Sequence, residues 1–380
     1  MSARRSGLSA LILALAACGG VTPIKSDGGS AGGAGDAGGT GGPGGAAGGA
    51  AGKSDGGSAG GAGDAGGTGG PGGAAGGAAG TNATGGASPA TDGGPADVPT
   101  SQDGPGGAGA CNLSRSFGEP VPVPGEVNTA MDEVAPRLSA DELTLYFARH
   151  AADTPGALND IYIASRSSLT TPFGTPAPLA INTASANEMD PMVATDGLTL
   201  FFASDRAPGM GESDIYFSTR AITTVGFMAA MPVPGVNTPG TEMQPFLAAG
   251  GDLWLAYRRP GSDTALHLRR APKTTVGFGT PVAIPELDGN ADDSWPVLSA
   301  DELTIYFSSA RTGPDVQGKP DVWVANRATR SGNFSAPVDL VAVNTAASEY
   351  VGWVSPDGCR LYFASNRRVN TAYDIFVAAR

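Results

Sequence analysis

Residues 117–380 alternate short apolar runs with polar turns, and the pattern recurs as one unit five times. A strand-like run rich in Leu, Tyr and Phe follows a turn of the Ser-x-Asp type in most units; these runs are 143–148, 198–203, 253–257, 303–308 and 361–365. A second apolar run follows and opens with Asp in every unit except the third; these runs are 160–166, 214–220, 265–270, 321–327 and 374–380. No stretch of ten residues has helical periodicity, so the pattern predicts short strands, about four to a unit.

A phenylalanine marks the same place in each unit. The five are spaced 51 to 56 residues apart: Phe117, Phe173, Phe227, Phe278 and Phe334. Four strands in a repeat of about 50 residues are typical of a propeller blade. The Ser-x-Asp turn, the Leu-Tyr-Phe strand and the Asp-Ile-Tyr strand resemble the WD40-like repeats of the TolB family. That resemblance covers nearly all of residues 117–380 and implies an all-β propeller.

The number of blades follows from the two ends of this repeat region. The fifth unit stops after the strand at 374–380, whereas the Phe117 region supplies a strand with no unit of its own. We expect the Phe117 strand to pair with the last blade, which removes an exposed edge and closes a ring of five blades. A sixth, unrecognised blade is the alternative.

The first 116 residues have a different composition and contain 39 of the 60 glycines but no aromatic residue. Such a segment cannot bury enough apolar surface to fold. Residues 1–17 read as a secretory signal, with Arg4 and Arg5 before a short apolar run. The following Leu-Ala-Ala-Cys resembles a bacterial lipoprotein box, which implies lipidation of Cys18 and, with Gly19 next, an outer-membrane lipoprotein facing the periplasm or the cell surface. Ordinary signal cleavage beside an incidental cysteine is the alternative.

Residues 18–110 are predicted to be a disordered tether rich in Gly and Ala. Residues 25–52 are repeated letter for letter at 53–80, and this composition is typical of flexible linkers. We therefore expect three parts: the signal peptide 1–17, the lipid-anchored tether 18–110 and the propeller 111–380.

Two cysteines remain after Cys18. Cys111 precedes the closing strand, and Cys359 lies in the turn between the first two strands of the last blade. In an up-and-down blade both positions fall on one rim, and an exported protein permits disulfides. We predict a Cys111–Cys359 disulfide; two free thiols are the alternative.

Candidate binding residues lie near the start of each inner strand. One acid recurs there in every unit: Glu133, Glu188, Glu242, Asp293 and Glu349. Such a ring could bind a cation or a sugar, or could serve hydrogen bonding between blades. Residues that break the repeat beside these acids include Trp295, Tyr350 and Trp353, whose rings could stack on a sugar or peptide or pack the core.

The net charge of −13 and the absence of a basic stripe argue against nucleic-acid binding. No nucleophile elbow, zinc-binding helix, phosphate-binding loop or C-x-x-C motif is present, and we expect no cofactor and no metal. The resulting hypothesis is a monomeric, non-catalytic module that binds an envelope protein or glycan through its loop-rich face and contacts the membrane only through its lipid. The alternative is a propeller glycoside hydrolase that uses channel carboxylates.

Overall fold

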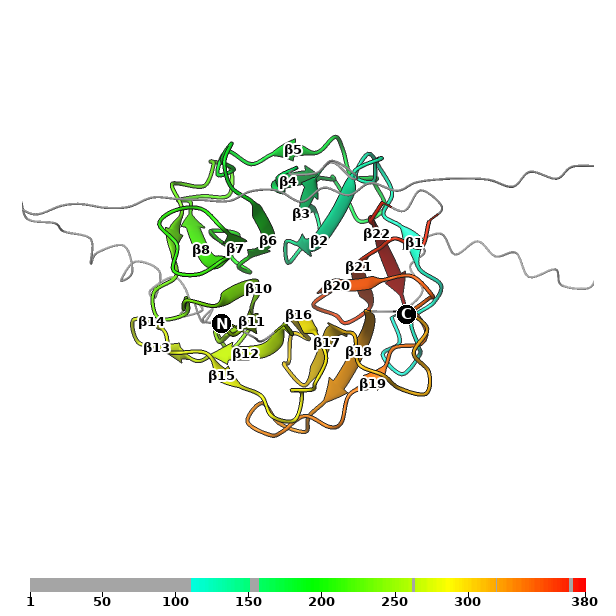
Figure 1. The fold of residues 1–380 in the computed structure, drawn as a ribbon. Coiled ribbons are helices and arrows are strands. Elements are labelled where there is room, and N and C mark those ends of the chain that lie inside the picture. The colour runs from blue at the N-terminus through cyan, green and yellow to red at the C-terminus, as the bar shows by residue number, and fades with distance from the viewer. Residues whose placement is uncertain (1–110, 151–156, 262–263, 319, 369–371) are drawn as a thin grey trace, which may run out of the picture. The chain divides into compact units, whose positions relative to one another are not determined.

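A computed structural model describes residues 111–380 except 151–156, 262–263, 319 and 369–371. Every four-stranded sheet in it is antiparallel, and five such sheets surround one centre (Figure 1). The predicted all-β, five-bladed propeller is confirmed, and the six-blade alternative is wrong. The predicted signal peptide 1–17, Cys18 and the tether 18–110 lie outside the described residues and stay predictions. Across the described segments, no helix has the length and apolar character that crossing a membrane requires.

Each blade uses its strands in chain order from the centre outwards. Blade one contains β2 (Asp132–Leu138), β3 (Thr144–His150), β4 (Asp160–Ser165) and β5 (Ala177–Pro178). Blade two contains β6 (Glu188–Val193), β7 (Thr199–Ser204), β8 (Asp214–Thr219) and β9 (Met231–Pro232). Blade three contains β10 (Thr241–Leu247), β11 (Leu253–Arg258), β12 (His267–Ala271) and β15 (Val282–Ala283), with a small hairpin of β13 (Lys273–Thr274) and β14 (Gly277–Phe278) between its last two strands.

Blade four contains β16 (Asp293–Leu298), β17 (Thr304–Ser309), β18 (Asp321–Asn326) and β19 (Val338–Asp339). Blade five contains β20 (Glu349–Val354), β21 (Arg360–Ser365), β22 (Asp374–Ala379) and, as its outer strand, β1 (Val121–Pro122). The outer strands are two residues long and mostly exposed, and three of them carry proline. Short proline-bearing edges discourage pairing with other chains.

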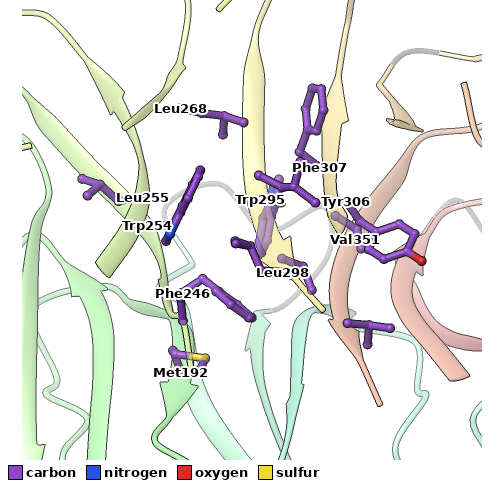
Figure 2. Close-up of a cluster of buried hydrophobic side chains, with 14 of the residues drawn as sticks. Met192, Phe246, Trp254, Leu255, Leu268, Trp295, Leu298, Tyr306, Phe307 and Val351 are labelled. Atoms are coloured by element: carbon purple, nitrogen blue, oxygen red, sulfur yellow. The ribbon is translucent and has the colours of Figure 1, made fainter. Parts of the chain in front are cut away.

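The second strand of each blade is buried on both faces because neighbouring blades cover it. β7, for example, is buried at all six positions, which explains why its sequence is continuously apolar rather than alternating. Aromatic and aliphatic side chains fill the space between blades, among them Phe246, Trp254 and Trp295 in the largest cluster (Figure 2). The core therefore lies between the blades.

Every inner strand departs from regular pairing at the same place. The ladder shifts register there, and the residue in the shift has a φ near +57° in four blades: Ala135, Asp190, Gln244 and Trp295. A proline follows each of these residues, which explains the recurrent acid-x-x-Pro spacing. Blade five instead has Gly352, where an added Cβ would lie 2.4 Å from the Pro136 carbonyl oxygen of blade one. Only glycine fits this contact between the first and last blades.

In four of the five repeats the marker phenylalanine packs against an arginine from an adjacent strand end, and the exception is Phe278. The guanidinium carbons of Arg166, Arg220, Arg327 and Arg380 lie 4.4 to 4.5 Å from the ring centroids of Phe173, Phe227, Phe334 and Phe117 respectively. Each of these arginines also donates from Nε to a backbone carbonyl of the adjacent hairpin. The pair ties the outer part of a blade to its middle hairpin.

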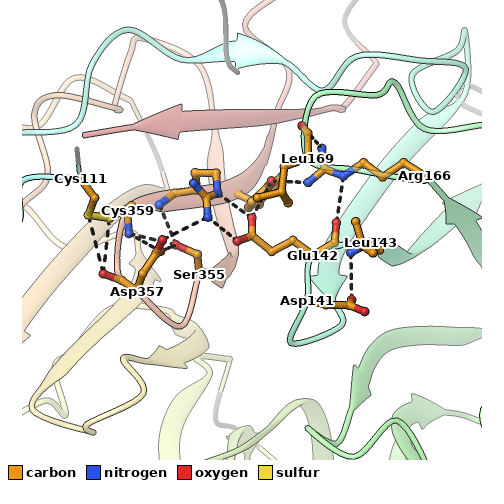
Figure 3. Close-up of polar contacts among 11 residues, drawn as sticks. Cys111, Asp141, Glu142, Leu143, Arg166, Leu169, Ser355, Asp357 and Cys359 are labelled. Atoms are coloured by element: carbon orange, nitrogen blue, oxygen red, sulfur yellow. Dashed lines mark hydrogen bonds and ion pairs between the residues drawn. A yellow bond between two sulfur atoms is a disulfide. The ribbon is translucent and has the colours of Figure 1, made fainter. Parts of the chain in front are cut away.

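The ring closes where the first described strand meets the last. Val121 pairs with Val377 and Pro122 with Phe376, and the Gly118 amide donates to the Ala379 carbonyl at 2.7 Å. Cys111 and Cys359 are joined by a disulfide whose Cα atoms are 5.7 Å apart (Figure 3). In the same region Arg360 donates to both carboxylate oxygens of Glu142, which joins blade five to blade one. A strand pairing, a disulfide and an ion pair therefore stabilise the region where the ring closes.

Candidate functional site

The five acids of the predicted ring begin the inner strands, and all are fully buried. The backbone amide of each donates, at 2.8 to 2.9 Å, to a carbonyl just before the third strand of the preceding blade. The accepting residues are Tyr373, Asn159, Ser213, Leu266 and Pro320. The acids thus lie at the blade-to-blade contacts, at the end of the inner strands where the longer loops emerge.

In four blades an arginine neutralises the acid. Glu133 pairs with Arg149 at 2.8 Å, Glu188 with Arg206 at 2.7 Å, Asp293 with Arg311 at 2.6 Å and Glu349 with Arg367 at 3.1 Å. The three glutamates among them also accept a backbone N–H and a hydroxyl hydrogen bond from one threonine: Thr129, Thr183 and Thr345. These carboxylates are occupied by contacts within their own blade.

Glu242 differs from the other four acids. It accepts from Thr238 N at 3.0 Å and Thr238 Oγ1 at 2.5 Å, but within the described residues no arginine forms an ion pair with it. Tyr257 occupies the place that Ser204 has in blade two, so Arg259 falls at the place of Arg206, but Arg259 is exposed. Arg258, one residue earlier, pairs with Glu212 at 2.5 Å. Burial without a cation raises the pKa of Glu242 to about 7.

Asp214 is the charged side chain that acts electrostatically on Glu242. Its charge adds to the rise in the pKa of Glu242. Asp214 Oδ2 accepts from the amides of Met210 at 2.7 Å and Gly211 at 3.3 Å, whereas Oδ1 is buried and has no partner in the part of the chain that is described. Asp374 has the same unpartnered oxygen, but the acid beside it, Glu133, is paired with Arg149.

A polar hollow of about 280 Å³ lies at the boundary of blades two and three, and neither Glu242 nor Asp214 is among the residues that line it. Its lining includes Glu212 from blade two together with Gly240, Thr241 and Arg258 from blade three. Thr241 Oγ1 donates to Glu212 Oε2 at 3.1 Å, and these contacts with Arg258 and Thr241 lower the pKa of Glu212. The hollow is therefore lined by hydrogen-bonding groups and one fixed carboxylate.

The three predicted aromatics divide between two places. Trp295 and Tyr350 lie 5.6 Å apart between centroids, and Tyr373 extends the group at 5.4 Å from Tyr350. Trp353 instead packs against Tyr362 in the core at the boundary of blades five and one. Burial and the neighbouring Tyr373 raise the pKa of Tyr350 above its usual range. The structure thus brings Trp295 and Tyr350 together and separates Trp353 from them.

Sequence reasoning missed a polar chain at the centre of the ring. The backbone N–H of Gln244 donates to Asp190 Oδ2 at 3.0 Å. The side-chain oxygen of Gln244, Oε1, in turn accepts from the backbone N–H of Trp295 at 3.0 Å. Arg137 lies close enough to Asp190 to favour its charged form, but burial dominates and raises the pKa of Asp190 to about 7. The signal was available, because Arg137, Asp190 and Gln244 are polar at positions where other blades have apolar residues. In the described segments no cluster of three or more His, Cys, Asp or Glu residues could hold a metal ion.

No protein-family model matches the chain, and no curated protein matches it. Solved structures do match. A family 117 glycoside hydrolase of Zobellia galactanivorans is 12% identical over 70% of this chain and 90% of its own, with a TM-score of 0.45. A family 43 β-1,3-galactosidase is 11% identical over 66% and 91%, also with a TM-score of 0.45. An α-L-arabinofuranosidase of Podospora anserina is 12% identical over 70% and 96%, with a TM-score of 0.43.

These neighbours are propeller glycoside hydrolases rather than TolB-type proteins, so the TolB resemblance extends only to the propeller fold. The expectation of a non-catalytic binding module is wrong on this finding, which favours the alternative, a propeller glycoside hydrolase. At these identities and TM-scores the matches concern the fold alone. The residues of a reaction site must be argued from this chain's own geometry.

Proposed function

We propose that the protein is a glycoside hydrolase whose reaction is carried by Glu242 and Asp214, at the boundary of blades two and three. The observation that carries the proposal is Glu242 itself: it is the ring acid that has no arginine partner among the described residues, and its pKa is about 7. An acid site that breaks the repeat is where a repeat protein can place chemistry. The other four acids are already neutralised.

The two carboxyl groups differ as glycoside hydrolysis requires. Glycosidases use one carboxylic acid that protonates the leaving oxygen and one carboxylate that supports the positive charge on the sugar. Glu242 holds its proton near neutral pH and is the proton donor as the C–O bond breaks. Asp214 supplies the carboxylate, through the Oδ1 atom that no described residue occupies.

The polar hollow at the boundary of blades two and three is where a sugar would bind. Its lining by Glu212, Thr241 and Arg258 provides donors and acceptors for hydroxyl groups. Both reacting carboxyls are buried, so the substrate reaches them only when the 207–213 loop moves away. Met210 and Gly211 of that loop cap Asp214, and the Met210 side chain is 64% exposed. The proposal therefore includes an opening of this loop.

The test is hydrolysis of a panel of chromogenic glycosides, including α-L-arabinofuranosides and β-galactosides, by the full chain and by variants. Glu242→Gln keeps the acceptor for Thr238 but has no proton to give, so we expect a roughly thousandfold fall in kcat/KM. Asp214→Asn should cause a comparable fall. Turnover by the unaltered protein should also decline above about pH 7, as Glu242 loses its proton.

Asp374→Asn is the matched control. Asp374 occupies in blade five the place of Asp214 in blade two and has the same unpartnered oxygen, but it lies beside a neutralised acid. It should keep turnover within about twofold. Absence of turnover on every glycoside, or full turnover by folded Glu242→Gln protein, would refute the proposal.

A further inference from the structure

The side chain of Arg137 lies across the centre of the ring. Arg137 follows the irregular position of β2 in blade one, and 1% of its surface is exposed. Its guanidinium carbon is 5.4 Å from the ring centroid of Phe246, which belongs to blade three. Blade one packs against blades five and two, so this contact with blade three spans the middle of the propeller.

This buried guanidinium lacks hydrogen-bond acceptors. Nη1 has no partner, and no hydrogen bond or ion pair to Arg137 is found within the described residues. The nearest opposite charge is Asp190 of blade two, which affects the pKa of Arg137 without forming an ion pair within 4.0 Å. Asp190 Oδ2 is already used by the Gln244 amide. A gap therefore separates the cation from the carboxyl group.

A buried cation without acceptors is costly, and the cost is not met by its other neighbours. Phe246 offers only a ring face, which carries no formal negative charge. Burial lowers the pKa of Arg137 to about 9, so the group is still charged at neutral pH. Burial also raises the pKa of Asp190 to about 7, so below that pH Arg137 is without a counter-charge. A water molecule would satisfy the N–H group but would leave the charge uncompensated.

We propose that the centre of the propeller binds one small monovalent anion, of the size of chloride, on the Arg137 guanidinium. The ligand is an anion because the unpartnered atom is a donor that carries positive charge. It is small because Arg137 is 1% exposed and the Phe246 ring lies 5.4 Å from its guanidinium carbon, which leaves little room beside the group. The site is separate from the Glu242 and Asp214 pair and does not depend on the proposed hydrolysis.

The experiment is thermal unfolding of the full chain at pH 6 in sodium chloride, sodium bromide or sodium gluconate at one ionic strength. Chloride and bromide should raise Tm by about 5 °C over gluconate, which is too large for the centre. Arg137→Met removes the guanidinium and should abolish the difference between the salts. Arg330→Met, which removes a half-exposed arginine, should keep the full difference.

A measurement on unaltered protein covers the case in which Arg137→Met does not fold. Crystals grown with bromide should give one anomalous scattering peak within hydrogen-bond distance of Arg137 Nη1. Equal Tm values in chloride and gluconate would overturn the proposal. So would the absence of that peak, or a salt response that Arg137→Met retains.

Discussion

One substitution in a repeated site changes its chemistry. Four ring acids pair with an arginine, whereas blade three keeps the buried carboxylate and has an exposed arginine, Arg259, at the place that Arg206 has in blade two. A buried glutamate that lacks a cation favours its neutral form. The change from a structural ion pair to a proton donor therefore needs no new residue at position 242, only the loss of a neighbour.

The raised pKa of Glu242 predicts that the stability of the folded protein depends on pH. Its native pKa of about 7 exceeds the ordinary value of 4.5, so the folded protein holds a proton between these pH values that the unfolded chain has lost. Stability should therefore fall as pH rises from 4.5 through 7. The loss is at most about 3 kcal/mol at pH 8. Glu242→Gln should remove this loss of stability. The free energy of unfolding of the variant should therefore rise relative to that of the unaltered protein at pH 8, and should not do so at pH 4.5.

Urea unfolding at the two pH values measures this difference. Glu188→Gln is the control, because it leaves the nearby Arg206 without its carboxylate. That variant should lose stability at both pH values. A Glu242→Gln variant that is less stable than the unaltered protein at pH 8 would contradict the assignment.

At the residue scale the sequence predicted positions but not partners. Repetition located all five acids, and the structure places them at equivalent points between blades. Their arginines lie 16 to 18 residues further along the chain, so nothing local in the sequence connects acid and base. The interaction of Arg137 with Asp190 could not be predicted for the same reason. The two residues belong to different blades and approach each other only at the centre of the ring.

Among the elements, the inner strands carry the strongest local constraint. Four of them place an ordinary residue at positive φ before a proline, and β20 uses glycine at its irregular position. The repeat thus tolerates Ala, Asp, Gln and Trp at one point, which makes this point available for side chains of different chemistry. The acid-x-x-Pro spacing was visible in the sequence, but the irregular backbone that causes it was not.

Gly352→Ala tests the fit of β20 against β2. The new Cβ would lie 2.4 Å from the Pro136 carbonyl oxygen and as close to its ring, and neither is a flexible side-chain end. The two strands must move apart, at a cost of about 1 to 3 kcal/mol in unfolding free energy. Gly226→Ala, at a position with open space, should change stability by less than about 0.5 kcal/mol. Chemical denaturation measures the unfolding free energy of both variants. Equal values would show that β20 and β2 can move apart without cost and would contradict the prediction.

For the whole molecule, closure is the property that the sequence predicted best. Pairing of the Phe117 region with the last blade follows from counting strands, and the structure has that pairing. The five blades follow from the same count. The activity did not follow, because every blade carries an acid at this point and the sequence does not show which of these acids an arginine neutralises.

Reduction of the disulfide tests closure. Cys111 and Cys359 are separated by 248 residues, and the bond holds the closing strand to blade five. Its removal should cost about 2 to 4 kcal/mol. The Tm of the full chain should fall in reductant, whereas the Cys111→Ser, Cys359→Ser double variant should have the lower Tm with or without reductant. A Tm that reductant leaves unchanged in the unaltered protein would argue against the bond.

The shared last blade also sets the order in which the protein can be completed. β1 finds its partner only in β22, so the earliest strand of the propeller has no ladder to join until nearly all of the repeat region is present. Contacts this distant in sequence form slowly, since a long loop must close first. During synthesis, four blades can therefore assemble while both ends of the incomplete ring expose unpaired strand edges. Until β1 and β22 pair, these edges are open to pairing with other chains.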